Sequence, residues 1–394
     1  MLKISDVIIS VETNQLIKDP YIKNGSPIYD NGQILHYSGG FAVVFPFQIN
    51  SEKWAFRCWT SSVKNVDKHL KALSKEMEKN RLPYFCEHTY VEKGICVNGE
   101  MYPTTRMKWV DGINIKDYIC INKNNRKKLI DLAGKFLKMC KDLGHRHMAH
   151  GDLQHGNILV DRNNEIKLID YDSVYSPILS GETDVIKGLA DYQHPNRKDN
   201  KYVSEKLDYF SELIIYLSIV AIAENPKLVD KYRIDDSESL LFTKSDYSDI
   251  KNSMIYYDIE KLGGQCHELL EILVEYLNKE YIDDLVPFYK KLSISYKIKI
   301  CVAFLFLVII IVTAVFFIKS SSQADQLSKF KKDVNVYIKR DVKNMDLKAL
   351  DSLLNVCEEF MKGNNEDKEL ERIKGKLKTH KAQRKAYEAK LKIK

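Results

Sequence analysis

The segment His150–Val160 (H-G-D-L-Q-H-G-N-I-L-V) constrains the fold of this chain more than any other feature. It places Asp152 and Asn157 five residues apart in a turn, and a β-type run that follows ends at Asp170. One carboxylate of such a set can orient and deprotonate a hydroxyl, while an amide oxygen and a second carboxylate hold Mg²⁺ against nucleotide phosphates. The alternative is a surface hairpin in which these residue types serve only turns. Two correctly spaced motifs in the correct order argue against that alternative.

Both motifs resemble the catalytic and metal loops of the protein-kinase superfamily, written H-R-D-x-x-x-x-N and D-F-G. The resemblance implies an α+β class and a bilobal protein-kinase-like fold, with a small β-rich lobe and a helical large lobe. It also implies ATP and Mg²⁺ as cofactors. In such a site Asp152 is the catalytic base, and Asn157 and Asp170 hold the metal.

Positions beside these motifs depart from the family pattern. Gly151 stands where the family has an arginine that receives an activation-loop phosphate, so that form of switching is not expected here. Tyr171 and Asp172 stand for the Phe and Gly of D-F-G. The missing glycine predicts a stiffer metal loop.

Residues 34–60 read as a glycine-turned hairpin followed by a further strand. By the resemblance, Gly39 and Gly40 let the backbone approach the phosphates, because no Cβ intervenes, and Val44 covers the adenine. Only the middle glycine of the family's G-x-G-x-x-G-x-V is present. A structural turn is therefore the alternative for this hairpin.

Ala55 and Arg57 fall where the family carries V-A-I-K, so an arginine replaces the lysine that pairs with the phosphates. Arginine can neutralise a phosphate, but its forked guanidinium is not equivalent to a lysine. An arginine on an exposed strand face is the alternative. A helix is expected over residues 62–80, where Glu76 or Glu78 could pair with Arg57.

Met107 and Val110 are expected at the hinge between the lobes, with Met107 behind the adenine and Val110 offering backbone hydrogen bonds. A long amphipathic helix over residues 124–147 then leads into the catalytic loop. Asp208 opens an apolar helix, as in the family's D-x-W-S, where a buried aspartate anchors the catalytic-loop backbone. An ordinary helix-capping role is the alternative for this residue.

The expected domain order begins with an irregular, polar lead-in (1–33), followed by the small lobe (34–110) and the large lobe (111–295). Residues 300–318 are 19 residues without a charge. At 1.5 Å per residue they would span about 28 Å, close to the roughly 30 Å hydrocarbon core of a bilayer. They predict one transmembrane helix, and a buried core helix is the alternative.

The predicted location is therefore the cell membrane, as a single-pass protein. Because ATP and Mg²⁺ are cytoplasmic, the kinase-like domain should lie inside and the tail, residues 319–394, outside. Lysines flank the span evenly, so charge alone does not decide the orientation.

The positive charge of the chain belongs to the tail. Residues 319–394 hold 20 Lys and Arg against 12 Asp and Glu, which leaves 41 against 42 for the rest. We therefore expect no nucleic-acid binding by the main domain. Apolar spacing in the tail from Leu347 to Leu377 predicts short paired helices or a weak coiled coil, through which the tail could self-associate. The eight cysteines show no zinc-like spacing, which favours reduced thiols.

The leading interpretation is a membrane-anchored enzyme that transfers the ATP γ-phosphate to Ser or Thr hydroxyls of proteins in a signalling role. A pseudokinase scaffold that binds nucleotide without chemistry is the second interpretation, motivated by Arg57 and the thin glycine loop. The third is a small-molecule phosphotransferase, because H-G-D-x-x-x-x-N and I-D-x-D also resemble aminoglycoside and choline kinases.

Overall fold

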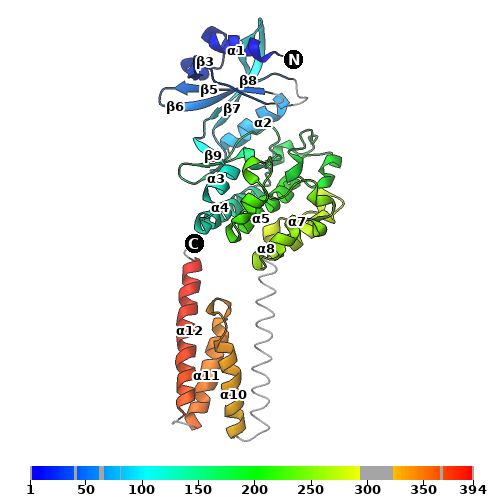
Figure 1. Cartoon of the computed structure of the whole chain (residues 1–394). Coiled ribbons are helices and arrows are strands. Elements are labelled where there is room, and N and C mark those ends of the chain that lie inside the picture. Colours follow the sequence, from blue (N-terminus) through cyan, green and yellow to red (C-terminus); the bar gives the residue numbers. More distant parts are fainter. Residues whose placement is uncertain are drawn as a thin grey trace. The chain divides into compact units, whose positions relative to one another are not determined.

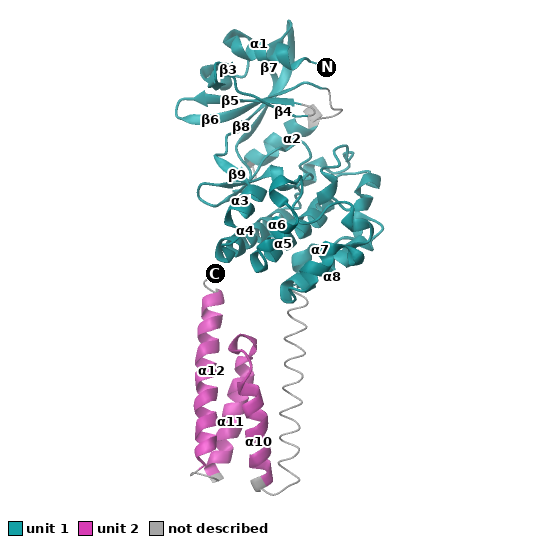
Figure 2. Ribbon diagram, in the orientation of Figure 1, with its two compact units in different colours: residues 1–292 teal, residues 293–394 magenta. Residues whose placement is uncertain are grey.

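The computed structural model divides the chain into two compact units, residues 1–292 and residues 293–394 (Figure 2). The described residues are 2–39, 42–61, 66–79, 81–292, 323–363 and 367–392.

The first unit opens with an antiparallel sheet in the order β1-β5-β6-β8-β7, in which β4 also pairs with β5 (Figure 1). Alternating bulky residues such as Phe45, Phe47 and Phe56 bury one apolar core beneath it. The β7–β8 hairpin turns at Asn98 and Gly99, which both have positive φ, as a two-residue turn requires. The strand bounds are β1 Ser26–Pro27, β4 Tyr37–Ser38, β5 Ala42–Ile49, β6 Glu52–Trp59, β7 His88–Val97 and β8 Glu100–Lys108.

The expectation of an irregular segment before the first strand is wrong. Helix α1 (Ile4–Glu12) lies there and buries Val7 and Val11, four residues apart on one helical face. Short strands β2 (Tyr29–Asp30) and β3 (Gln33–Ile34) form a small hairpin after it. In the sequence this periodicity is short and is flanked by turn residues that indicate an irregular segment.

The helix expected over residues 62–80 is confirmed as α2 (Val66–Lys79), and it contacts β7. Leu70 and Leu73 are buried on its inner side. The Ser74 hydroxyl accepts the backbone N–H of Tyr90 and lies 3.0 Å from Nδ1 of His88. This pair of hydrogen bonds fixes the helix against the edge of the sheet.

The large lobe follows a short connection after β8. It contains a second antiparallel sheet in the order β11-β10-β9 and a set of helices (Figure 1). Helix α5 is buried along its length, and α4, which leads into the catalytic loop as expected, packs against it. The bounds are β9 Gly112–Asn114, β10 Ile158–Asp161, β11 Ile166–Leu168, α3 Ile115–Asn122, α4 Arg126–His145, α5 Tyr209–Glu224, α6 Lys227–Lys231, α7 Met254–Glu260 and α8 Gly264–Leu277.

The prediction of a transmembrane helix, and with it the single-pass membrane location, is contradicted. No helix within the described ranges is both long and apolar enough to cross a bilayer. The apolar α5 has 16 residues and so measures about 24 Å, short of a roughly 30 Å hydrocarbon core. The stretch 300–318 itself lies outside the described residues.

The second unit contains α10 (Gln323–Ile338), α11 (Leu347–Gly363) and α12 (Lys368–Lys392). Leu350 and Leu370 are fully buried in a core that these helices share. The paired helices expected in the tail are confirmed. The apolar side chains that suggested self-association are already buried within this unit, and self-association itself stays a prediction.

Candidate functional site

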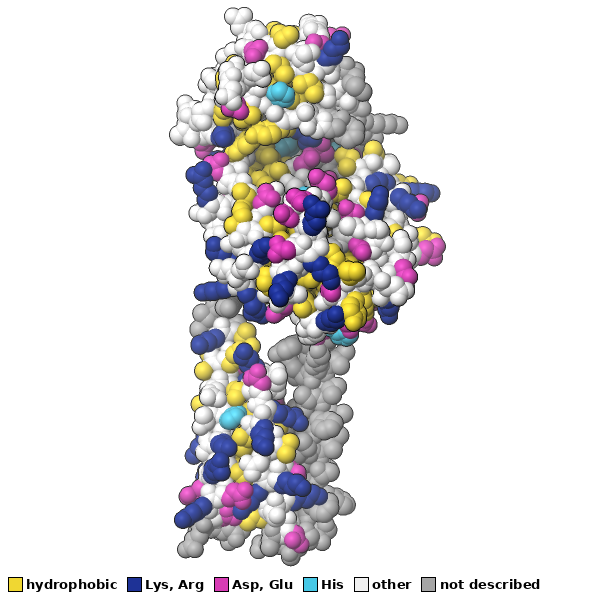
Figure 3. All heavy atoms as spheres, viewed as in Figure 1, with side chains coloured by type: hydrophobic (Ala, Val, Ile, Leu, Met, Phe, Trp, Pro, Cys, Tyr) yellow, Lys and Arg dark blue, Asp and Glu magenta, His cyan; other side chains and the backbone are white. Residues whose placement is uncertain are grey.

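A cavity of about 600 Å³ lies between the small-lobe sheet and the loops around β10 and β11. Figure 3 shows apolar side chains, with acidic ones beside them, where the surface of the first unit is hollowed. The lining residues predicted from the sequence come from both lobes: Gly39, Val44, Ala55, Arg57, Met107, Val110, Asp152, Asn157 and Asp170. Gly40, also predicted for this site, lies outside the described residues.

The catalytic-loop backbone is held by Asp208, which is 1% exposed at the start of α5. Its carboxylate accepts the backbone N–H groups of His150 and Gly151. Burial raises the pKa of Asp208 above its ordinary value, and these backbone donors oppose that shift. The prediction that this aspartate anchors the loop is confirmed.

Gly151 is required by the close approach of two loops. Its φ is +80°, and a Cβ at this position would collide with the backbone carbonyl of Ser173. An arginine at position 151 would therefore not fit. With glycine at this position the two loops are in direct contact. In the same region, His150 Nε2 lies 2.9 Å from the carbonyl oxygen of Ile169.

The Asp152 carboxylate is positioned from both of its sides. One oxygen accepts the backbone N–H of Leu189 at 3.1 Å, and the other lies 3.3 Å from the side-chain nitrogen of Asn157. The same Asn157 nitrogen donates to the Asp152 carbonyl oxygen at 2.9 Å. Because its nitrogen is used in this way, the amide oxygen of Asn157 is left as the group able to bind a cation.

The metal loop is fixed by Tyr171, whose side chain is buried in the core. The Tyr171 hydroxyl donates to the Leu168 carbonyl oxygen at 2.7 Å and accepts the Cys86 N–H at 2.8 Å. Asp170 precedes it with φ +63°, which turns this aspartate toward the cavity. The hydroxyl therefore makes two hydrogen bonds that a phenylalanine at this position could not make.

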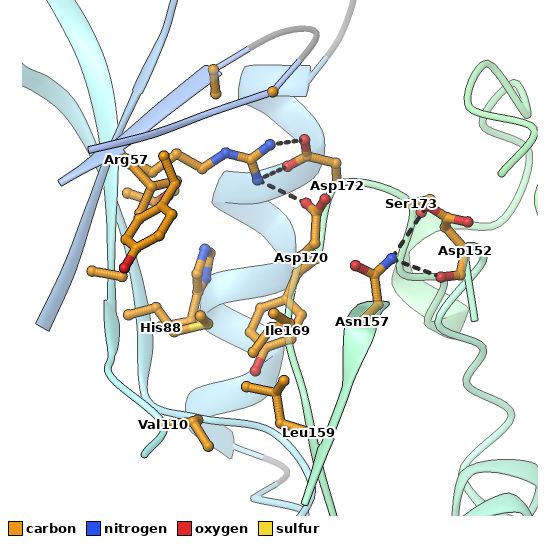
Figure 4. Close-up of a pocket in the computed structure, with 18 of the residues that line it drawn as sticks. Arg57, His88, Val110, Asp152, Asn157, Leu159, Ile169, Asp170, Asp172 and Ser173 are labelled. Atoms are coloured by element: carbon orange, nitrogen blue, oxygen red, sulfur yellow. Dashed lines mark hydrogen bonds and ion pairs between the residues drawn. The ribbon is translucent and has the colours of Figure 1, made fainter. Parts of the chain in front are cut away.

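Arg57 extends from β6 across the cavity to the metal loop (Figure 4). It contacts Asp170 at 2.9 Å and makes a two-pronged ion pair with Asp172, at 2.8 and 2.5 Å. Burial acts to lower the pKa of Arg57, but the charges of both aspartates raise it overall. Burial raises the pKa of Asp172 to about 6, although the positive charge of Arg57 acts to lower it.

The expected partners of Arg57 on α2 were Glu76 and Glu78. The carboxylates that act on its pKa are Asp170 and Asp172, which lie in the large lobe. The arginine is 19% exposed, so the alternative of an arginine on an open strand face does not apply. Its ion pairs join the small lobe to the large lobe.

The donor set fits a nucleotide that carries its own Mg²⁺. Asn157 and Asp170 supply hard oxygen donors at one side of the cavity. Among the described residues, no group of three or more His, Cys, Asp or Glu could hold a metal ion. Mg²⁺ commonly takes one or two carboxylates and completes its shell with phosphate oxygens and waters, so a small protein donor set is what such a site needs.

The apolar part of the lining was only partly predicted. Trp109 in the hinge lies 6.0 Å from the ring of Tyr37, between ring centroids, and both line the cavity. Leu159 and Ile169 lie on the opposite, large-lobe side. Their outward alternation on β10 and after β11 was a usable signal. Asp172 was recognised only as the residue that replaces the glycine of D-F-G, and His88 carried no local signal of a place in this site.

Comparisons with known proteins indicate a kinase-like chain. Residues 104–178 match the family described as the ABC1 atypical kinase-like domain. A probable LRR receptor-like serine/threonine-protein kinase and a receptor-like protein kinase, both from Arabidopsis thaliana, are each 26% identical to the chain over 165 residues. That segment is 40% of this chain, and the chain spans 18% of the length of each of these relatives. The family match contains Asp152, Asn157 and Asp170, and it begins after Arg57.

Proposed function

Because this chain belongs to the protein-kinase-like superfamily, we propose that it transfers the γ-phosphate of ATP to a protein Ser or Thr hydroxyl. The observation that carries the proposal is the convergence of Asp152, Asn157, Asp170 and Arg57 in one cavity. These side chains come from separate elements and supply the base, the oxygen donors and the cation that phosphoryl transfer requires. We propose that this phosphorylation serves signalling.

Asp152 accepts the proton of the attacking hydroxyl, since its carboxylate is held at the cavity edge by Asn157 and the Leu189 N–H. Asn157 and Asp170 would hold Mg²⁺, which neutralises phosphate charge when bound with the nucleotide. Arg57 faces the same end of the cavity and would pair with phosphate oxygens. Trp109, Met107 and other apolar residues of the lining would enclose the adenine ring of ATP.

The experiment uses the purified full-length protein with Mg²⁺, γ-labelled ATP and a generic basic protein as acceptor. Label transfer by the wild type should fall by about 100-fold or more in Asp152→Asn and Asp170→Asn. Asp117→Asn, at an exposed position of α3 outside the cavity lining, is the control and should keep full activity. A wild type that binds ATP but never transfers label to protein overturns this proposal.

A nucleotide-binding protein without chemistry is the second candidate, and one contact favours it. Arg57 occupies one oxygen of Asp170, the carboxylate assigned to the metal. If that contact persists when nucleotide binds, only the second Asp170 oxygen is left for the metal and the positive charge of Arg57 opposes its binding, so transfer is suppressed. ATP would then raise the melting temperature of the protein with or without Mg²⁺, and no label would move.

A further inference from the structure

The two aspartates that contact Arg57 do so in different ways. Asp172 uses both carboxylate oxygens against the two terminal nitrogens of the guanidinium, at 2.8 and 2.5 Å. Asp170 uses one oxygen, and it shares a nitrogen that already contacts Asp172. A two-pronged arginine–carboxylate pair fixes the plane and direction of the guanidinium, which a single contact does not.

Burial separates the two aspartates further. The Asp172 side chain is 11% exposed and the Asp170 side chain 45% exposed. A buried carboxylate that lost Arg57 would be left as an unpaired charge, at high cost. Asp170 can exchange Arg57 for another cation, because water can solvate its charge while it has no partner. Arg57 should therefore stay with Asp172 when Asp170 changes partner.

The backbone between the aspartates does not move freely. Tyr171 lies between them with its ring in the core, and its hydroxyl is bonded to Cys86 and Leu168. Asp172 is thus held at a fixed place on the Arg57 side of the cavity (Figure 4). In protein kinases a helix glutamate orients the corresponding strand cation, whereas here that carboxylate belongs to the metal loop.

We propose that Asp172 is the positioning residue of Arg57: it holds the guanidinium toward the phosphates and leaves Asp170 for Mg²⁺. This inference rests on the proposed function. When Asp172 is neutralised, Arg57 keeps Asp170 as its one carboxylate in this contact and competes with Mg²⁺ for it. Asp172 therefore protects the metal ligand from the neighbouring arginine.

The test is the Mg²⁺ concentration that gives half-maximal label transfer by the full-length protein at saturating ATP. Asp172→Asn should raise this concentration about 10- to 100-fold, the range found when partners of metal ligands are removed. Adding Arg57→Met to Asp172→Asn should return the Mg²⁺ requirement toward the wild-type value, because the competing cation is gone. The same double variant should still bind ATP weakly. Quenching of Trp109, the tryptophan that lines the cavity, reports that binding.

Asp19 provides a matched control. It is buried outside the cavity lining, and one terminal nitrogen of Arg106 donates to both of its oxygens at 2.9 Å. Asp19→Asn should lower the melting temperature and leave the Mg²⁺ requirement unchanged. If Asp172→Asn behaves like Asp19→Asn, the positioning role is wrong.

A second variant covers the case in which Asp172→Asn does not fold. Asp172→Glu keeps the charge but displaces its oxygens by one methylene, so it should raise the Mg²⁺ requirement in the same direction, but less than Asp172→Asn does. An unchanged requirement in this variant overturns the inference. A wild type that neither binds ATP nor transfers label overturns the proposed function, which is a different outcome from an active wild type with an unaffected Asp172→Asn.

Discussion

Gly151 shows how one residue without a side chain affects the position of Asp152, the proposed catalytic base. Two costs apply to any replacement there, a positive φ and a collision with the Ser173 carbonyl. Gly99 has a similar φ of +86° but open space around its Cβ position, so it carries the first cost alone. The two glycines therefore form a matched pair.

We predict that Gly99→Ala lowers the free energy of unfolding by about 1 kcal/mol, the cost of a left-handed alanine. Gly151→Ala should lower it by about 2–4 kcal/mol, because overpacking against a backbone carbonyl adds to the strain. Urea denaturation of the two variants and the wild type measures both losses. Equal losses at the two positions would show that the contact with Ser173 is not tight.

His88 is a buried histidine whose neutral form the fold requires. Burial lowers its pKa to about 3, and the positive charges of Arg57 and Arg106 act in the same direction. Since the unfolded chain has an ordinary histidine pKa of about 6.5, it binds more protons than the folded chain between these values. Neutral His88 therefore makes its full contribution to the free energy of unfolding above about pH 6.5, and this contribution is lost as the pH falls toward 3.

We predict a loss of up to about 1.4 kcal/mol of unfolding free energy per pH unit from His88 as the pH falls from 6.5. In His88→Asn the amide oxygen can still accept the Ser74 hydroxyl, but the titration is absent. Denaturant unfolding of both proteins between pH 7.5 and 5 gives the difference. Parallel stability curves would contradict a neutral His88.

At the scale of elements, the sequence could predict those whose pattern is local. Turn residues between apolar runs indicated β5 and β6, and a helical repeat indicated α4. The site residues of the catalytic and metal loops could be predicted because they lie within one short segment. Because these residues are close in sequence, their spacing along the chain also limits how far apart they can lie in the fold.

Contacts between distant segments could not be predicted in this way. Arg57 and Asp172 are 115 positions apart, and nothing near Arg57 distinguishes that partner from a glutamate on α2. The Gly151 contact with Ser173 also depends on how two loops meet. Local patterns fix elements, but the pairing of charges across the lobes depends on the tertiary fold.

The start of α5 anchors the catalytic loop, and Asp208→Asn tests that link between elements. An amide offers one accepting oxygen where the carboxylate serves the N–H groups of His150 and Gly151, so one buried donor loses its partner. We predict a loss of about 1–3 kcal/mol in unfolding free energy. Amide hydrogen exchange should accelerate at these two residues.

Ser253→Ala is the control for Asp208→Asn. Ser253 caps α7 by accepting the N–H of Tyr256, so its loss should cost about 1 kcal/mol. Hydrogen exchange in the catalytic loop should not change in this variant. Unchanged exchange at His150 and Gly151 in Asp208→Asn would contradict the anchoring role.

At the scale of the whole molecule, the chain combines a bilobal unit with a helical unit that has its own core. The lobes of the first unit are joined by the hinge and by ion pairs of Arg57. The helical unit buries its leucines internally. Each unit should therefore unfold cooperatively on the strength of its own apolar contacts.

The two units can be followed separately because the three tryptophans, Trp54, Trp59 and Trp109, all belong to the first unit. We predict that Leu350→Ala, in the core of the second unit, destabilises that unit by about 2–5 kcal/mol, the cost of a cavity in a packed core. The helical signal in far-ultraviolet circular dichroism should then lose part of its amplitude at lower denaturant, while the tryptophan fluorescence transition stays in place. Leu143→Ala in α4, equally buried in the first unit, should shift the fluorescence transition instead. A fluorescence transition that moves with Leu350→Ala would show that the units unfold as one.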